Sequence, residues 1–114
     1  MTDISTRTLD DGIEVVRPPE RLNMVTAPRL VAVIGDLIAG GHARVVIDLT
    51  ATEFIDSSGL GALVSCLKKT RQAGGDLRIA GSTPHVQTVF DLTNLGRVLQ
   101  LSTTVEIASA TFQT

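Results

Sequence analysis

The sequence has no tryptophan or tyrosine, only three phenylalanines and a single cysteine. It also has no excess of basic residues, since 10 Lys and Arg against 12 Asp and Glu give a formal net charge of −2. Nucleic-acid binding needs a basic surface, and single strands also need aromatic side chains for stacking. Both are missing here. We therefore expect no nucleic-acid partner.

Cys66 has no second cysteine with which to form an internal disulfide. The first residues do not show a basic segment followed by an apolar one, so nothing predicts secretion, and we expect a cytoplasmic protein. Asp36 and Asp48 interrupt the apolar segments well before the roughly 20 residues that a membrane-spanning helix needs. We expect no direct membrane insertion, although docking to a membrane protein stays open.

The length of 114 residues is typical of one domain, which we expect to span 1–114. Apolar and β-branched segments predict strands at 4–9, 13–17, 45–49, 77–80 and 98–101. The Asp10-Asp11-Gly12 turn predicts that the first two pair as an antiparallel hairpin. The strand at 45–49 is apolar almost throughout, which is typical of a central strand that is covered on both faces.

Apolar residues at helical spacing predict three helices between these strands. The first begins at Thr26, a potential cap, and ends at Gly40-Gly41; the second ends at Gly74-Gly75; the third runs from Pro84 to Leu95. In the first helix, Val33 is expected to be exposed. The segment 103–110 fits either a helix or a strand. Together these elements predict a small single-domain α/β fold. Its mixed sheet is mostly parallel, with an antiparallel N-terminal strand, and is flanked by helices.

The sequence offers little for catalysis. His42 and His85 lie in no motif that pairs them with a serine, and Asp56 stands where a nucleophile elbow around Ser58 needs a glycine. No phosphate-binding loop and no cluster with metal-ligand spacing is present. We therefore expect a protein that is not an enzyme, with no catalytic residues, no metal and no cofactor.

The most informative segment joins an apolar strand to the second helix, and it reads Asp56-Ser57-Ser58-Gly59-Leu60-Gly61. One interpretation is plain helix capping, because Asp and Ser accept hydrogen bonds from the free amides of a first turn. The other is a modification site, since the two glycines leave the turn open to another protein's active site. A phosphate at a helix N-terminus is stabilised by the amides and the macrodipole. It would therefore leave the fold in place and change the binding of partner proteins.

This segment, together with Val45-Val46-Ile47-Asp48-Leu49 before it and Gly74-Gly75-Asp76-Leu77 after it, resembles a STAS domain of the anti-sigma factor antagonist family. The similarity extends over nearly the whole chain, from Leu22-Asn23 to Val89-Phe90-Asp91-Leu92. It implies that Ser57 is phosphorylated by an anti-sigma factor that is also a serine kinase. The unphosphorylated protein would bind this anti-sigma factor and free the sigma factor. Phosphorylation would abolish the binding, and a serine phosphatase would restore it.

The resemblance places the partner-binding face at Asp56, Ser57, Ser58, Gly59, Leu60 and Gly61, with Asn23 nearby. Two positions depart from the family pattern of Gly-Glu-Leu-Asp before the first helix, where this sequence has Glu20-Arg21-Leu22-Asn23. Glu20 replaces a glycine and Asn23 replaces an acid. Both differences affect how this loop would contact the kinase.

Two other hypotheses remain. A stand-alone STAS subunit of a membrane transporter complex would use the same fold as a structural clamp, with the serine as a cap. A small hydrolase is the third, although no motif places a base. Cys66 lies among apolar residues of the second helix. We therefore expect a buried thiol in preference to a redox sensor.

Overall fold

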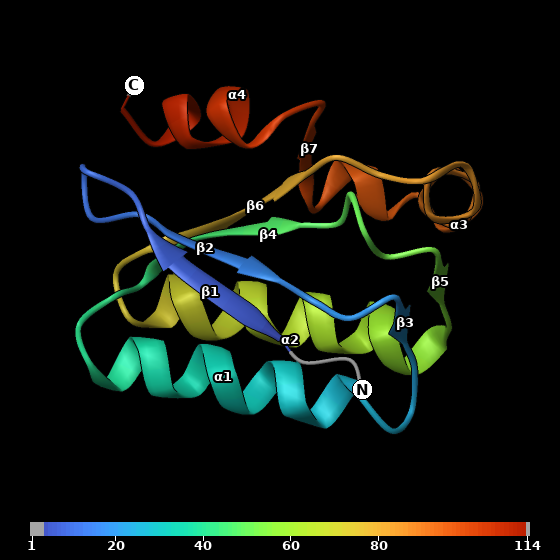
Figure 1. Ribbon diagram of the computed structural model, residues 1–114, viewed down its shortest axis with the longest axis horizontal. Helices are drawn as coiled ribbons and strands as arrows, with labels where there is room; N and C mark the ends of the chain where they lie inside the picture. Colours follow the sequence, from blue (N-terminus) through green and yellow to red (C-terminus); the bar gives the residue numbers. More distant parts are fainter. Residues whose placement is uncertain (1–3, 114) are drawn as a thin grey trace.

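A five-stranded sheet forms the middle layer of the protein (Figure 1). The computed structural model describes residues 4–113. The strands are β1 (Ser5–Thr8), β2 (Glu14–Arg17), β4 (Arg44–Asp48), β6 (Asp76–Ala80) and β7 (Gln100–Ser102), in the order β1-β2-β4-β6-β7. β1 pairs antiparallel with β2, and all other pairs are parallel. The predicted mixed sheet and the central place of β4 are confirmed.

The hairpin between β1 and β2 closes through a short turn at Asp10-Asp11-Gly12. The Leu9 amide donates to the Ile13 carbonyl at 2.8 Å, and the Gly12 amide donates to the Leu9 carbonyl at 2.9 Å. Gly12 has a φ of 85°, which favours glycine because it has no Cβ. The turn that the sequence predicts is therefore present.

A second sheet contains two short parallel strands, of which the sequence indicated only the one before the second helix. β3 (Arg21–Leu22) lies beside β5 (Phe54–Ile55), with Arg21 opposite Phe54 and Leu22 opposite Ile55. β3 has only two residues and follows Pro18-Pro19, so it carries no periodic pattern that a sequence could reveal. Its existence depends on the neighbouring strand β5.

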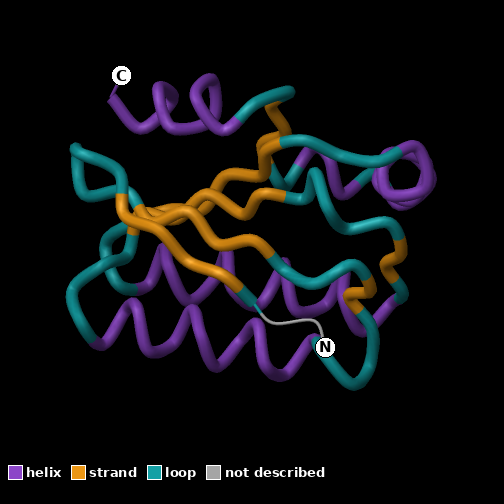
Figure 2. Tube along the Cα trace, viewed as in Figure 1, coloured by secondary structure: helices purple, strands orange, loops and turns teal. Residues whose placement is uncertain are grey.

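Two long helices cover one face of the main sheet, and a short one covers part of the other (Figure 2). In the view of Figure 1, α1 (Ala27–Ala39) and α2 (Ser57–Gln72) run side by side below the strands. α4 (Val105–Ala110) lies above β4 and β6. α3 (Pro84–Thr93) lies next to β5. Both predicted long helices are confirmed. The prediction that Thr26 caps α1 is wrong, because its hydroxyl donates to the Arg21 carbonyl at 2.7 Å and makes no cap hydrogen bond.

The two faces of β4 bury different side chains. Val45 and Ile47 belong to the larger apolar cluster, between the sheet and α1 and α2, whereas Val46 belongs to a smaller one with residues of α4. Because side chains alternate along a strand, a strand covered on both faces is apolar on both, as Val45, Val46 and Ile47 are. Val33, which the sequence places in solvent, is half-buried against the larger cluster.

The C-terminal region differs from the prediction in its strand. Residues Leu95–Arg97 form a 3₁₀ turn after Asn94 ends α3 with a φ of 59°. β7 consequently runs from Gln100 to Ser102, so the predicted strand at 98–101 began two residues and ended one residue too early. The ambiguous segment 103–110 is a helix, in which the Thr104 hydroxyl caps the Ile107 amide at 3.1 Å.

Asp48, at the end of β4, makes the fold sensitive to acid. Burial alone would raise the pKa of this carboxyl, but hydrogen bonds from the Thr50 hydroxyl (2.7 Å) and amide (3.0 Å) and the nearby Arg17 guanidinium (3.0 Å) outweigh it. The pKa of Asp48 therefore lies below its ordinary value of 3.8. The stability this provides is present above the unfolded-state pKa and is lost as pH falls through the folded-state pKa.

We expect the free energy of unfolding to fall less between pH 7 and pH 3 in Asp48→Asn than in the wild type. Urea unfolding followed by circular dichroism at several pH values measures this. Asp10→Asn, which removes an exposed carboxylate from the hairpin turn, serves as the control. An unchanged pH dependence in Asp48→Asn would contradict the role of this carboxylate.

Candidate functional site

Asp56 sets the start of α2. Its extended backbone ends β5, and its Oδ1 atom accepts a hydrogen bond from the Gly59 amide at 2.9 Å. Its own amide donates to the Leu22 carbonyl of β3 at 3.2 Å. The capping interpretation is therefore confirmed for Asp56, and the same residue attaches the helix to the small sheet.

Ser57 and Ser58 are the first two residues of α2 rather than its caps. Ser57 is exposed, whereas Ser58 is half-buried. Neither hydroxyl forms a hydrogen bond within residues 4–113. The Ser57 hydroxyl is thus accessible to another protein, and it lies at the positive end of the helix macrodipole.

The two glycines of this turn have different surroundings. Gly59 is buried, and a Cβ there would overlap the Leu22 carbonyl oxygen and lie 2.7 Å from Cγ1 of Ile55. Gly61 is exposed, and a Cβ there would meet no heavy atom within 4 Å. The expectation that both glycines leave the turn open holds only for Gly61, because Gly59 faces the small sheet. Leu60 is half-buried and packs against the main core.

Asn23 shapes the loop that faces this turn. Its Oδ1 accepts hydrogen bonds from the amides of Val25 (2.9 Å) and Thr26 (3.2 Å), and its own amide donates to the Thr26 hydroxyl at 2.9 Å. These bonds close the loop and leave Met24 and Val25 in solvent, with 73% and 64% of their surfaces exposed. Met24 was not predicted as a site residue, because two adjacent apolar residues in a short loop are not a pattern that indicates a site.

Three side chains stack on the outer side of β3 and β5, an arrangement that no sequence pattern indicated. The Arg21 guanidinium lies 4.9 Å from the centre of the Phe54 ring, and the His85 ring stacks on Phe54 at 5.4 Å and 9°. Glu20 is exposed, and its carbonyl accepts from the amides of Glu53 (2.8 Å) and Phe54 (3.1 Å). Glu20 therefore helps to align β5 through its backbone, a role that any residue type could fill.

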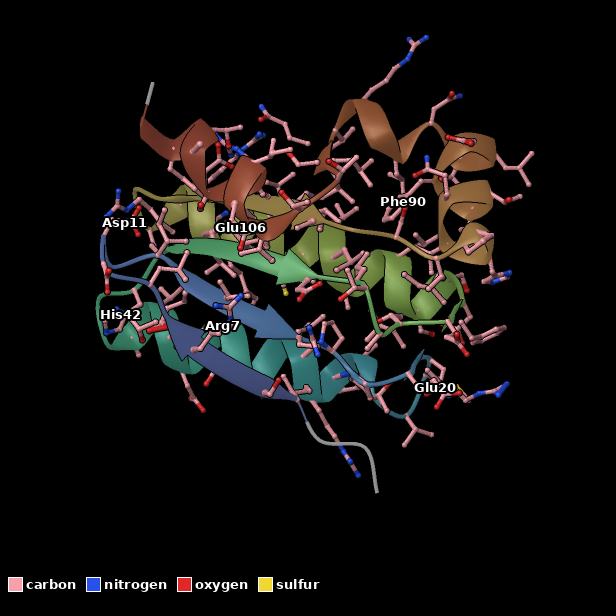
Figure 3. The ribbon with its side chains drawn as sticks, turned by 45° about the horizontal axis from the view of Figure 1, so that its top comes forward. Arg7, Asp11, Glu20, His42, Phe90 and Glu106 are labelled. Carbon is pink, nitrogen blue, oxygen red and sulfur yellow. The ribbon has the colours of Figure 1, made fainter. Side chains whose placement is uncertain are left out.

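The two histidines do not converge on the serines. His85 is occupied in the stack with Phe54, and His42 lies 3.6 Å from the buried Glu14 carboxylate. Figure 3 places His42 and Glu20 at opposite ends of the molecule. Among the described residues, no group of three or more His, Cys, Asp or Glu side chains is arranged to hold a metal ion. Within residues 4–113, no helix combines the length and apolar character that crossing a membrane requires.

Comparison with known proteins assigns the family. The pattern of the STAS domain matches residues 6–108. The chain belongs to the STAS domain family. An anti-sigma-B factor antagonist of Staphylococcus epidermidis is 31% identical over 105 residues, which cover 92% of this chain and 96% of that protein.

Solved STAS structures agree with this assignment. The crystal structure of an anti-sigma factor antagonist from Mycobacterium paratuberculosis has a TM-score of 0.82 and 32% identity, covering 98% of this chain and 96% of that one. The anti-sigma factor antagonist SpoIIAA of Bacillus has been solved unphosphorylated and phosphorylated. The unphosphorylated form has a TM-score of 0.73 and 16% identity, and the match covers 95% of this STAS chain and 94% of SpoIIAA. The phosphorylated form has a TM-score of 0.72 and 19% identity, and the match covers 96% of this chain and 99% of SpoIIAA. Because both identities are below 20%, the similarity to SpoIIAA shows only that the two proteins share a fold.

We expect opposite effects from alanine at the two glycines of the α2 turn. Gly59→Ala should lower the free energy of unfolding by about 1–3 kcal/mol, because the methyl group overpacks a site bounded by backbone. Gly61→Ala should raise it by up to about 1 kcal/mol, because alanine is the better helix former and meets no neighbour. Chemical denaturation measures both. Equal effects would contradict the close packing of Gly59 on β3.

Cys66 should be unreactive in the folded protein. Burial raises the pKa of its thiol to about 12 despite the nearby Lys69, so hardly any thiolate exists at neutral pH. We expect negligible labelling by Ellman's reagent at pH 8 and labelling of one thiol per chain in denaturing urea. Rapid labelling without denaturant would instead favour redox control.

Proposed function

We propose that this protein is an anti-sigma factor antagonist and that phosphorylation of Ser57 controls its binding to an anti-sigma factor. The observation that carries the proposal is the Ser57 hydroxyl, which is exposed, makes no hydrogen bond within the described residues and begins helix α2. The curated relative and the mycobacterial structure that share about 30% identity with this chain are both named as antagonists of anti-sigma factors, which supports the same role.

The position of Ser57 favours a change in binding over a change in fold. A phosphate adds about −1.5 to −2 charges, and the free amides and the macrodipole of a helix N-terminus stabilise such an anion. The core beneath the turn does not include the Ser57 side chain, so it need not rearrange. A partner that covers Ser57 would meet a new dianion within the interface and dissociate. SpoIIAA has been solved both unphosphorylated and phosphorylated, so this fold accommodates a phosphate.

The proposed partner is an anti-sigma factor with serine kinase activity, and a serine phosphatase restores the unmodified protein. The binding face consists of Asp56, Ser57, Ser58, Leu60 and Gly61, with Asn23 on the adjacent loop. Gly59 lies beneath this face and offers no surface to a partner. In this role the protein is the substrate of a kinase and not itself an enzyme. Its action on a sigma factor system implies a cytoplasmic location.

The transporter hypothesis predicts a structural clamp in which the α2 turn is only a helix cap. The capping function belongs to Asp56, which leaves the exposed Ser57 hydroxyl without a structural task among residues 4–113. Together with the names of the relatives, this favours the antagonist over the transporter subunit.

The test identifies the partner and then maps the modification. Immobilised wild-type protein should capture from a lysate of the source organism an anti-sigma factor that immobilised Ser57→Asp does not retain. After purification, that kinase and Mg-ATP should place one phosphate on Ser57, as mapped by mass spectrometry.

Three variants test whether Ser57 is the phosphorylated residue. Ser57→Ala should bind the kinase without being modified, and Ser57→Asp should bind about tenfold or more weakly, because a charge is placed in the interface. Ser58→Ala, the matched control, should still be phosphorylated. A phosphate on another residue, together with binding that neither Ser57 variant changes, would refute the proposal.

A further inference from the structure

A shallow groove runs between α1 and α2, beginning beside the phosphoacceptor. Its first part is a hollow of about 400 Å³. Residues on both sides line it, among them Met24, Ala27, Pro28 and Val31 on one side and Gly61 and Ser65 on the other. A second hollow of about 320 Å³ follows along the same pair of helices, where Gly35 and Ile38 of α1 face Lys69 and Gln72 of α2.

The apolar end of this groove adjoins Ser57. Ser58, the next residue, lines the first hollow. The exposed Met24 and Val25 stand at the same end, and they are neighbours in the chain. Leu92 and Ile107, which are also exposed, lie on α3 and α4 and line neither hollow. Met24 lines the hollow and adjoins Val25 in an exposed apolar surface, and contiguous surface of this kind is typical of a site that another protein covers.

The opposite end of the groove is cationic. Lys69, which lines the second hollow, is exposed and makes no ion pair within residues 4–113. Arg71, two residues further along α2, is paired with Asp76 at 3.0 Å. Ser58 and Lys69 are 11 residues apart on one helix, which corresponds to roughly 16 Å at 1.5 Å per residue. The groove thus offers an apolar end and, about three helical turns away, a free positive charge.

Together these features define the chemistry of the occupant. Gly61 has no side chain and Ser65 a small one, so a segment of another protein can come close to α2 without displacing bulky groups. An apolar side chain of that segment fits against Met24 and Val31, and a carboxylate about three turns further along fits Lys69. An amphipathic helix with these two features matches the length and polarity of the groove.

We propose that the anti-sigma factor docks through an acidic amphipathic segment in the groove between α1 and α2, and that this contact presents Ser57 to the kinase. The inference rests on the proposed function, because it takes the occupant to be the kinase that modifies Ser57. Continuity with Ser57 and the unpaired Lys69 favour this occupant over a second copy of the chain. A second copy packed groove to groove would bring no carboxylate to Lys69, because neither hollow is lined by an acidic residue.

The test uses a variant whose added side chain fills the groove without disturbing the fold. Gly61→Leu adds a side chain where the structure leaves open space, and leucine is a better helix former than glycine. We expect phosphorylation of Ser57 by the purified kinase to fall at least about tenfold in kcat/KM, since the side chain occupies the docking site. Ala32→Leu places the same leucine side chain at an exposed position of α1 that lines neither hollow, and it should leave the rate unchanged.

Two further variants examine the ends of the groove separately. Met24→Ala should weaken binding of the kinase several-fold through loss of apolar contact, whereas Ile107→Ala on α4 should not. Lys69→Glu should slow association and reduce its dependence on salt concentration, because an attractive charge is replaced by a repulsive one. Circular dichroism and thermal unfolding show that each variant is folded.

The outcomes separate the two proposals. If the wild type is phosphorylated on Ser57 and the groove variants react and bind as it does, the docking proposal is overturned and the proposed function stands. If the kinase never modifies Ser57 of the wild type, the proposed function fails and the docking proposal fails with it. A loss of rate in Ala32→Leu equal to that in Gly61→Leu would also overturn the docking proposal.

Discussion

The approach of helix α2 to strand β3 is the constraint on which the site depends. The Leu22 carbonyl accepts the Asp56 amide and lies directly against Gly59, so the first turn of α2 touches the backbone of β3. Because a side chain at Gly59 would push the two apart, glycine at this position fixes how deeply the helix start is seated. The loop that contains Asn23 follows Leu22 immediately. The same contact therefore brings the loop to the side of the two serines.

The resulting arrangement separates rigidity from accessibility. The backbone of the turn is held by the Asp56 cap and by β3, and hydrogen bonds of Asn23 close the facing loop. The exposed groups lie on this support: the Ser57 hydroxyl, the open surface at Gly61 and the apolar side chain of Met24. A charge added to Ser57 would therefore alter the surface while the underlying packing stays in place. That combination suits a protein that reports its state through binding.

Much of the fold could be predicted from local pattern. Alternation and β-branching predicted the strands around Val46 and Ile79, helical spacing predicted α1 and α2, and Gly12 predicted the hairpin turn. The predictions failed where the pattern was short or where a distant segment decided the outcome. β3 has only two residues and exists through its pairing with β5. Thr26 has the right type and position for a cap, yet its hydroxyl is taken by the Arg21 carbonyl, which the turn brings within 2.7 Å.

The sequence by itself determined the order of elements, the capped strand-to-helix junction and the presence of two serines and two glycines within it. Only the tertiary structure decided how exposed and how closely packed each member of a pair is. Ser57 and Ser58 are alike in sequence, but the direction in which each leaves the first helical turn exposes one and half-buries the other. Gly59 and Gly61 are likewise equivalent until β3 packs against one side of the turn. Exposure and close approach depend on neighbours from distant parts of the chain, so no local pattern could reveal them.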